Sequence, residues 1–501
     1  MHTRPRIAVL LLVGMLLLVA CGSSVGAAAV PNPTIIPTIA PTVVPTPAPT
    51  AVPVFAAGSR VAGVDVSGLA ITAARERLVA ALASKPTPIE LRAGDVSLTI
   101  DPQTFGLSSS VDDLIGQADS ALRAGKPVDV PLLASLDDAA LRAQLVSLAE
   151  RVATPPQISV ISSTKTISRS FAYTPGMTLD VDAALPRVRA ALTSARHAAT
   201  LALTLTEDPV VPQVSNERIL AEIQSMASQW GGVIGVHLHD LKTGAEVRFH
   251  DKTVFAGAST IKVAIMLNAY INLATFTTKQ ELWLGDMIKY SDNIAANNLL
   301  AAAAGGTSTE YAFSGATQMS KMLAKDLGLE NLYLYVPYEA IDFIKQNKIK
   351  YMCGPRDPVG EKPYTESGCA LRATPYAIAQ VYKVIDACAN GSGPLLEKFA
   401  NLSPKRCQQM LDRLATNDDK TRMVAGLPTG TRVEHKSGWI ENLQADNGIV
   451  RSPNGDYVLS VYVYKKLPKG VSMWSDEMMA PTVAAFSRLA YTAYNPVRLK
   501  K

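Results

Sequence analysis

Two segments with the pattern of β-hairpins enclose a largely helical block in the C-terminal half of the chain. The first, GGVIGVHLHDLKTGAEVRFHDK, has two strand-like runs joined at residues 242–244, and the second, ADNGIVRSPNGDYVLSVYVYKK, turns at residues 453–456. Both turns contain glycine, which permits the tight backbone geometry of a hairpin. Strands at both ends of a helical block predict one antiparallel sheet completed by both ends of the segment, with helices packed around it. We therefore expect an α+β domain with a helical lobe over residues 216–494.

The rest of the chain predicts further units, because 501 residues exceed what one hydrophobic core usually serves. Residues 58–207 alternate strand-like and helix-like runs, which predicts a separate, smaller α+β domain, either as one unit or as two similar halves. Residues 31–53 contain eight prolines and regular threonines, a composition that stays extended. They lie in a predicted disordered linker, residues 22–57.

The N-terminus has the pattern of an export signal. Arg4 and Arg6 precede an apolar run over residues 7–20, which is short for a membrane span but typical of a secretory signal. The run ends in LLVAC, which resembles the lipobox of a bacterial lipoprotein signal. The resemblance implies that residues 1–21 form the signal segment and that Cys21 becomes lipidated. An uncleaved anchor is the alternative, and both interpretations place the chain on the outer face of the bacterial cell membrane.

Four further cysteines remain once Cys21 is set aside: Cys353, Cys369, Cys388 and Cys407. An even number of cysteines in an exported protein predicts two disulfides. Three pairings are open, and the short intervals favour Cys353–Cys369 and Cys388–Cys407. Four free buried thiols are the alternative.

The charge pattern excludes a nucleic-acid partner. The 48 basic and 43 acidic residues leave a net charge of +5, with no basic block and no interleaved aromatic stripe. His237 and His239 lie on one face of a predicted strand, but no third ligand accompanies them in the sequence, so we interpret them as ordinary strand residues. We expect no metal, no organic cofactor and a monomer.

The segment GASTIKVAIM places a serine and a lysine one helical turn apart. Ser259 lies at the predicted start of a helix, and Lys262 points along the same face. The residues that follow are apolar enough to bury the helix. A lysine buried there loses solvation, so its neutral form becomes available as a base for the serine hydroxyl. Surface snorkelling of Lys262 is the alternative for this pair taken alone.

Two other short motifs carry suitable chemistry. In KYSDNIAANNLL, Ser291 can relay a proton, Asp292 can cap a helix and the amide of Asn293 can hold a substrate carbonyl. Each function is weakly specified when this motif is considered by itself.

The third motif, VEHKSGW, lies in a strand-like run before the final hairpin. Lys436 and Ser437 can bind a substrate carboxylate, Gly438 leaves room for the substrate, and the N–H of Trp439 can face an oxyanion.

These three motifs, in this order, resemble the penicillin-recognising serine hydrolases, which include class A β-lactamases and penicillin-binding proteins; Ser437 stands where that set has threonine. The resemblance implies a β-lactamase- or transpeptidase-like fold over about residues 216–494. It also implies the role of each residue: Ser259 as acylated nucleophile, Lys262 as its base, Ser291 as proton relay, Asn293 as substrate holder, Lys436 and Ser437 as carboxylate site, and the N–H groups of Ser259 and Trp439 as oxyanion hole. The implied substrates are a β-lactam or a peptidoglycan stem peptide ending in D-Ala-D-Ala.

The chain departs from the class A pattern at the deacylation step. The motif Glu-x-x-Leu-Asn is absent, and we interpret the nearest carboxylates, Glu339, Glu361 and Glu366, as solvated loop residues. Without a base for water, acylation would proceed while hydrolysis stalls. The alternatives to a β-lactamase are therefore a D,D-peptidase or penicillin-binding protein that deacylates slowly, and a non-catalytic cell-wall-binding lipoprotein.

A second resemblance concerns residues 58–207. The stretches GVDVSGL and YTPGMTLD resemble the peptidoglycan-binding domain of VanW-like exported bacterial proteins. This resemblance implies peptidoglycan as a binding partner and identifies no binding residues.

Overall fold

The computed structural model describes residues 52–83, 87–132, 135–193, 199–349, 361–365 and 370–500. The predicted signal segment, Cys21 and most of the linker lie outside these residues, as do Cys353, Cys369 and Glu366. No helix in the described ranges combines the length and the apolar character needed to cross a membrane.

The C-terminal domain is built on a five-stranded sheet with the order β12-β11-β18-β17-β16. Its strands are β11 (Val233–Asp240), β12 (Glu246–Phe249), β16 (Val433–Ile440), β17 (Leu443–Val450) and β18 (Tyr457–Tyr464). All neighbouring strands are antiparallel, and β11 from the start of the domain pairs along its whole length with β18 from its end. The predicted sheet, completed by both ends of the segment, is confirmed.

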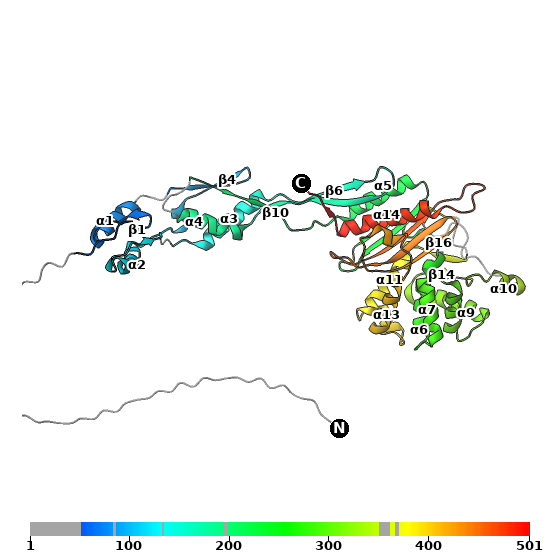
Figure 1. Cartoon of the computed structure of the whole chain (residues 1–501). Helices are drawn as coiled ribbons and strands as arrows, with labels where there is room; N and C mark the ends of the chain where they lie inside the picture. The colour runs from blue at the N-terminus through cyan, green and yellow to red at the C-terminus, as the bar shows by residue number, and fades with distance from the viewer. Residues whose placement is uncertain are drawn as a thin grey trace, which may run out of the picture.

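Alternation along β11 assigns its side chains to two different cores, because successive residues of a strand face opposite sides. Ile234, Val236 and Leu238 are buried against α5 (Asn216–Trp230) and α14 (Asp476–Tyr494). The opposite face carries the helical lobe, which Figure 1 shows on the other side of the sheet from α5 and α14.

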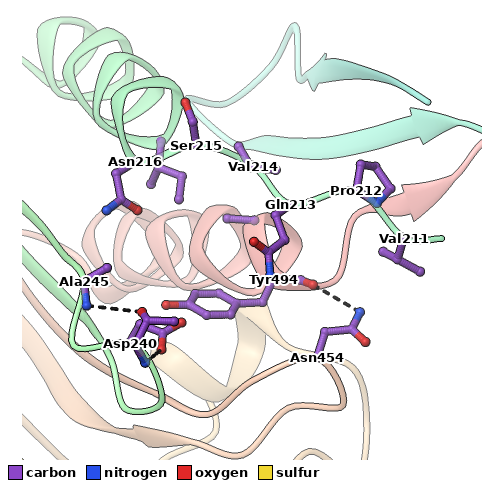
Figure 2. Close-up of a pocket in the computed structure, with 13 residues that line it drawn as sticks. Val211, Pro212, Gln213, Val214, Ser215, Asn216, Asp240, Ala245, Asn454 and Tyr494 are labelled. Carbon is purple, nitrogen blue, oxygen red and sulfur yellow. Dashed lines mark hydrogen bonds between the residues drawn. The ribbon is translucent and has the colours of Figure 1, made fainter. Parts of the chain in front are cut away.

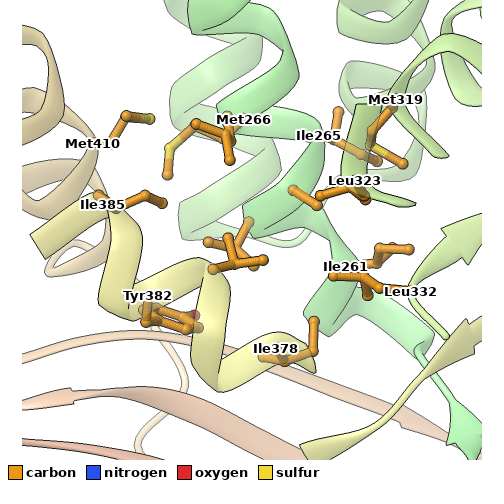
Figure 3. Close-up of a cluster of buried hydrophobic side chains, with 14 of the residues drawn as sticks. Ile261, Ile265, Met266, Met319, Leu323, Leu332, Ile378, Tyr382, Ile385 and Met410 are labelled. Atoms are coloured by element: carbon orange, nitrogen blue, oxygen red, sulfur yellow. The ribbon is translucent and has the colours of Figure 1, made fainter. Parts of the chain in front are cut away.

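The helical lobe surrounds α6 (Lys262–Asn272), whose side chains are buried on every face from Lys262 to Tyr270. A helix that is apolar all round must lie inside a domain. In Figure 3 its side chains Ile265 and Met266 lie among residues from the surrounding helices, which bury them completely. The other elements of the lobe are α7 (Thr278–Lys289), α8 (Asn293–Ala303), α9 (Thr309–Leu327), α10 (Ile341–Gln346), α11 (Pro375–Ala389), α12 (Pro394–Lys398) and α13 (Pro404–Leu414).

Short elements connect the lobe to the sheet. A three-stranded sheet has the order β13-β15-β14. Its members are β13 (Phe255–Ala256), β14 (Tyr333–Leu334) and β15 (Leu371–Ala373); two 3₁₀ helices, η2 (Ala258–Ile261) and η3 (Met423–Gly426), precede α6 and β16.

The predicted disulfide between Cys388 and Cys407 is present, with Cα atoms 5.8 Å apart. It joins α11 to α13, two helices that also share buried side chains of the lobe core. The other predicted pair lies outside the described residues.

The N-terminal part has two hydrophobic clusters. One involves α1 (Ile71–Leu82) and α2 (Val111–Arg123), and the other involves α3 (Asp138–Val152) and α4 (Val181–Leu192). The strands and the 3₁₀ helix of this part are β1 (Arg60–Val61), β2 (Val64–Asp65), β3 (Ile89–Ala93), β4 (Val96–Ile100), η1 (Pro102–Phe105), β5 (Asp129–Val130), β6 (Gln157–Ser162), β7 (Arg169–Thr174), β8 (Met177–Leu179), β9 (Thr200–Leu203) and β10 (Leu205–Glu207).

The β6–β7 hairpin falls inside the predicted 58–207 domain yet packs on the C-terminal domain. Phe171 is fully buried in the core that includes α5 and α14, and its N–H donates to Thr492 Oγ1 at 2.9 Å. Strand β19 (Val497–Arg498) pairs with β7 in parallel. The predicted domain limits stay a prediction, since packing by itself does not define an independently folding unit.

A cavity of about 810 Å³ lies beside this junction (Figure 2). Residues 211–216, which lead into α5, form one wall, and Asp240 and Tyr494 form another. Asp240 ends β11 opposite Tyr457, whereas Gly438 of β16 is in register with Ala445 and hence with Tyr462. The cavity therefore lies away from the Lys436-Ser437-Gly438 segment.

Candidate active site

Ser259 and Lys262 lie where the predicted helix begins. Ser259 is in η2 and is partly exposed, while Lys262 is the first residue of α6 and is fully buried. Lys262 Nζ lies 3.1 Å from Ser259 Oγ. The lysine of this pair is therefore turned inward toward the serine, and the alternative of a snorkelling surface lysine is wrong.

Lys262 Nζ has three further polar neighbours, all from the Ser291-Asp292-Asn293 segment. It lies 2.6 Å from Ser291 O, 3.3 Å from Ser291 Oγ and 2.6 Å from Asn293 Oδ1. An ammonium group has only three hydrogens to donate. Four contacts, two of them to hydroxyls that can donate in return, suit an amine that exchanges protons with its neighbours.

Burial governs the protonation of Lys262. Loss of solvation, aided by the positive charge of Lys436, lowers the pKa of Lys262 to about 7; Asp292 and Glu339 oppose the shift. Relative to water, this shift disfavours the charged amine by about 5 kcal/mol. The neutral form is therefore well populated near pH 7, which a general base requires.

Asp292 fixes the position of the second motif. It is the N-cap of α8, and its carboxylate accepts from the Ala295 N–H at 2.6 Å. This confirms the predicted cap. Asn293, the first residue of α8, uses both ends of its amide: Oδ1 accepts from Lys262, and Nδ2 donates to Glu339 Oε1 at 2.8 Å.

Glu339 is more closely tied to the site than the sequence indicates. Its side chain is exposed, as expected of a loop carboxylate, yet it is hydrogen-bonded to Asn293. The preceding residue, Tyr338, is held by Asn297 of α8, whose amide donates to Tyr338 O at 2.7 Å and accepts from its N–H at 2.9 Å. The Tyr338 ring lies 4.6 Å from Lys262 Nζ. The loop is thus anchored so that Glu339 faces the site.

Left-handed backbone conformations gather around these groups. Ala258, Ser291 and Glu339 have φ angles of 45°, 61° and 58°. Such conformations cost about 1–3 kcal/mol for residues other than glycine and persist only where the surroundings enforce them. Tyr338 helps to hold Ala258 in its left-handed conformation, because the Tyr338 hydroxyl donates to Ala258 O at 2.8 Å.

Strand β16 brings the third motif to the same place. Lys436 is almost fully buried, and its Nζ donates to Ser437 O at 3.0 Å. Burial lowers the pKa of Lys436 to about 8, although the carboxylates of Asp446 and Asp419 oppose the shift. Trp439, at the outer end of the motif, is 46% exposed.

Gly438 shows that β16 touches the segment that contains Ser259. A Cβ atom at Gly438 would lie 2.7 Å from Ser259 N and 2.8 Å from Thr260 N. Only glycine permits this approach of two backbones, since a side-chain atom would overlap the backbone nitrogens. The three motifs therefore converge on one site.

Replacement of Gly438 by alanine is expected to lower the rate of Ser259 acylation by about 100-fold, because the added methyl displaces the backbone beside the nucleophile. The free energy of unfolding should fall by about 1–3 kcal/mol. Labelling by a fluorescent penicillin and urea unfolding measure the two effects. Gly285→Ala in α7 is the matched control, since its Cβ meets open space. Equal labelling rates in both variants would contradict the close approach.

Sequence reasoning missed a charged pair beside β16. Asp419 forms an ion pair with Arg422 at 2.5 Å. Burial opposes ionisation of Asp419, but Arg422 and the Ser437 hydroxyl hold its pKa below the ordinary value. The Arg422 guanidinium lies 4.8 Å from the centre of the Trp439 ring. These residues fall outside any short motif, and only the fold brings them to the strand.

The three motifs meet around Lys262 and Gly438, the convergence that their resemblance to the penicillin-recognising serine hydrolases implies. A model of the beta-lactamase enzyme family matches residues 216–275 and 273–495, more than half of the chain. The chain belongs to the beta-lactamase enzyme family.

Solved structures similar to the chain include a mutant of PBP-A in an acyl-enzyme complex with penicillin G. It is 20% identical, with a TM-score of 0.41, and the match covers 57% of this chain and 99% of that chain. Another is an ancestral class A β-lactamase, GNCA, which is 21% identical with a TM-score of 0.40 and is matched over 55% of this chain and 100% of its own. A comparison with curated proteins found no significant match.

Proposed function

We propose that the chain is an exported serine hydrolase that opens a β-lactam, or a D-Ala-D-Ala-like amide, through an acyl-Ser259 intermediate. The observation that carries the proposal is the position of Lys262 Nζ, within 3.3 Å of both Ser259 Oγ and Ser291 Oγ. One amine thus contacts both the nucleophile and the proton relay.

The acylation step follows from this geometry. Neutral Lys262 takes the proton of Ser259, whose oxygen attacks the substrate carbonyl carbon and forms the new C–O bond. The N–H groups of Ser259 and Trp439 stabilise the resulting oxyanion. As the C–N bond breaks, Ser291 donates its proton to the leaving nitrogen and recovers one from Lys262. Lys436, Ser437 and Asn293 hold the substrate.

Hydrolysis of the acyl-enzyme needs a base for water, and Glu339 is the candidate that the site supports. Its carboxylate accepts a hydrogen bond from Asn293, and its negative charge favours the protonated form of Lys262 and so raises the pKa of that lysine. Glu361 instead forms an ion pair with Lys252 at 3.4 Å. If Glu339 does not activate water, the protein acts as a D,D-peptidase or penicillin-binding protein that stays acylated, which is the second candidate function.

One experiment separates these functions. The full-length protein is incubated with a chromogenic cephalosporin and, separately, with a labelled penicillin, and both assays are repeated with Ser259→Ala. Turnover that Ser259→Ala abolishes indicates a β-lactamase, and stoichiometric label without turnover indicates a penicillin-binding protein. Absence of label in the wild type would overturn the proposal and favour a non-catalytic cell-wall binder.

Acylation is expected to have a bell-shaped dependence on pH. Lys262 must be neutral, so the rate constant should rise with pH through about 7, and Lys436 must stay charged to bind a carboxylate, so the rate constant should fall through about 8. Rates of penicillin labelling between pH 5 and 10 measure both limbs. In Lys436→Arg the guanidinium keeps its charge, so the basic limb should disappear while the acidic limb remains. A profile without an acidic limb would contradict the role of Lys262.

The remaining proposals rest on the sequence. We propose a lipid anchor at Cys21, a position on the outer face of the bacterial cell membrane, and peptidoglycan as the ligand of residues 58–207. Globomycin, which inhibits lipoprotein signal processing, should cause an unprocessed form to accumulate, and Cys21→Ala should abolish lipid labelling.

A further inference from the structure

Three potential metal ligands meet on the β11–β12 pair, at the opposite edge of the sheet from β16. His237 and His239 share one face of β11, and the antiparallel register places Glu246 of β12 directly opposite His239. One ligand atom from each residue lies within 4.8 Å of the other two. The third ligand that the sequence pattern lacked is therefore supplied by the neighbouring strand.

The separations suit a small metal ion. Glu246 Oε1 lies 3.0 Å from His239 Nδ1 and 3.8 Å from His237 Nε2. In a tetrahedral zinc site with bonds of about 2.0–2.1 Å, ligand atoms are about 3.3 Å apart. These two separations bracket this value, and all three ligand atoms lie within 4.8 Å of one another.

His237 is already oriented as a metal ligand. It is fully buried, and its Nδ1 is hydrogen-bonded to Asp251 Oδ2 at 2.9 Å. The bond to a carboxylate favours the tautomer with the proton on Nδ1 and a free lone pair on Nε2. Nε2 is buried without a hydrogen-bond partner and lies on the Glu246 side of the ring. A carboxylate behind a ligating histidine is the usual outer-shell partner in metal sites.

The third ligand atom, Glu246 Oε1, faces both histidines, because Arg248 bonds to the other carboxylate oxygen, Oε2. Oε1 is hydrogen-bonded to His239 Nδ1. An ion bound here would take the place of that proton, since metal binding releases protons from its ligands.

We propose that His237, His239 and Glu246 bind a divalent metal ion of the zinc type. Two neutral imidazoles and one carboxylate are a ligand set that zinc uses widely, and a water molecule completes a tetrahedron. The carboxylates of Glu246 and Asp251 neutralise the charge of the ion, while Arg248, which lies beside both carboxylates, moderates the affinity.

The ion would stabilise the edge of the sheet. Strand β12 is four residues long and pairs only with β11 among the described strands. A metal that joins His237 and His239 of β11 to Glu246 of β12 would fix this edge strand. The role is structural and independent of acylation at Ser259.

The test uses the full-length protein, purified without a polyhistidine tag, stripped with a chelator and equilibrated with Zn²⁺ alone. Mass spectrometry of the dialysed protein should find about one zinc ion per chain. At a zinc concentration 100-fold above Kd, Tm should rise by about 5 °C or more. His237→Ala and Glu246→Gln should lose both the bound zinc and the shift in Tm.

Two further features keep the test decisive. Glu246→Gln preserves the size of the side chain, so a folded variant by circular dichroism separates loss of a ligand from loss of the fold. His250→Asn is the matched control, because His250 lies outside the cluster with a φ of 47°, which asparagine tolerates. This control should bind zinc as the wild type does. A wild type that binds no zinc, or cluster variants that bind as much as the wild type, would overturn the proposal.

Discussion

Lys262→Met is expected to lower the rate constant for acylation of Ser259 by about 10²–10⁴-fold, the usual contribution of a general base. Lys262 Nζ is 3.1 Å from Ser259 Oγ, and methionine leaves no group there that can take its proton. Methionine also leaves Ser291 O and Asn293 Oδ1 without their donor, so the free energy of unfolding should fall by about 1–3 kcal/mol, and circular dichroism checks that the variant is folded. Stopped-flow or gel-based labelling with a fluorescent penicillin measures the rate constant.

A second substitution separates the base from the charge at this position. Lys262→Arg keeps a cation near Ser259, but a guanidinium does not deprotonate at accessible pH, so acylation should again be nearly lost. Lys289→Met, which replaces a lysine in the last turn of α7, is the control and should be labelled at the wild-type rate. Substantial labelling of Lys262→Arg would mean that Lys262 acts through its charge and that the base lies elsewhere.

The framework of the C-terminal domain could be predicted because its signals are local. Period-two alternation and turn residues mark β11, β12, β17 and β18, and each of these signals requires fewer than a dozen consecutive residues. Their assembly into one sheet followed from the order of the elements. The same logic placed Asp292 at a helix start, because a capping residue acts on the N–H groups next to it in sequence.

The parts of the candidate sites that the sequence did not predict depend on contacts between segments far apart in the chain. Glu339 lacks the expected Leu-Asn sequence after it, and the structure links it to Asn293 by anchoring the Tyr338 backbone on Asn297 of α8. Likewise, Glu246 joins two histidines only through the register of β12 on β11. A pattern within a single segment cannot contain a contact that another segment supplies.

The burial of α6 connects the fold to the chemistry. Because α6 is enclosed on all sides, water is kept away from Lys262, and this loss of solvation lowers the pKa of its amine. A lysine with a lowered pKa can be neutral near pH 7, as a general base must be. The apolar run after Ser259 thus has two effects, since it forms the core of the lobe and sets the protonation of Lys262, the proposed base. Substitutions in this core can therefore change activity without touching substrate.

Glu339→Gln is expected to lower the rate constant for hydrolysis of the acyl-enzyme by about 10²–10⁴-fold while acylation stays close to the wild-type rate. Glutamine keeps the oxygen that accepts from Asn293 Nδ2 but cannot take a proton from water. The acyl-enzyme should then accumulate to one equivalent, which intact-protein mass spectrometry detects as a stable adduct on Ser259. The decay of that adduct after excess penicillin is removed gives the rate constant directly.

Glu361→Gln is the matched control for this prediction, because Glu361 is a loop carboxylate that bonds to Lys252 rather than to the site. Its adduct should decay at the wild-type rate. If the Glu339→Gln adduct also decays at that rate, Glu339 does not activate the hydrolytic water. If instead only Glu339→Gln retains the adduct, the single hydrogen bond from Asn293 to Glu339 explains how the chain can deacylate without the Leu-Asn residues of the class A pattern. The substitution therefore distinguishes a β-lactamase from a protein that remains acylated.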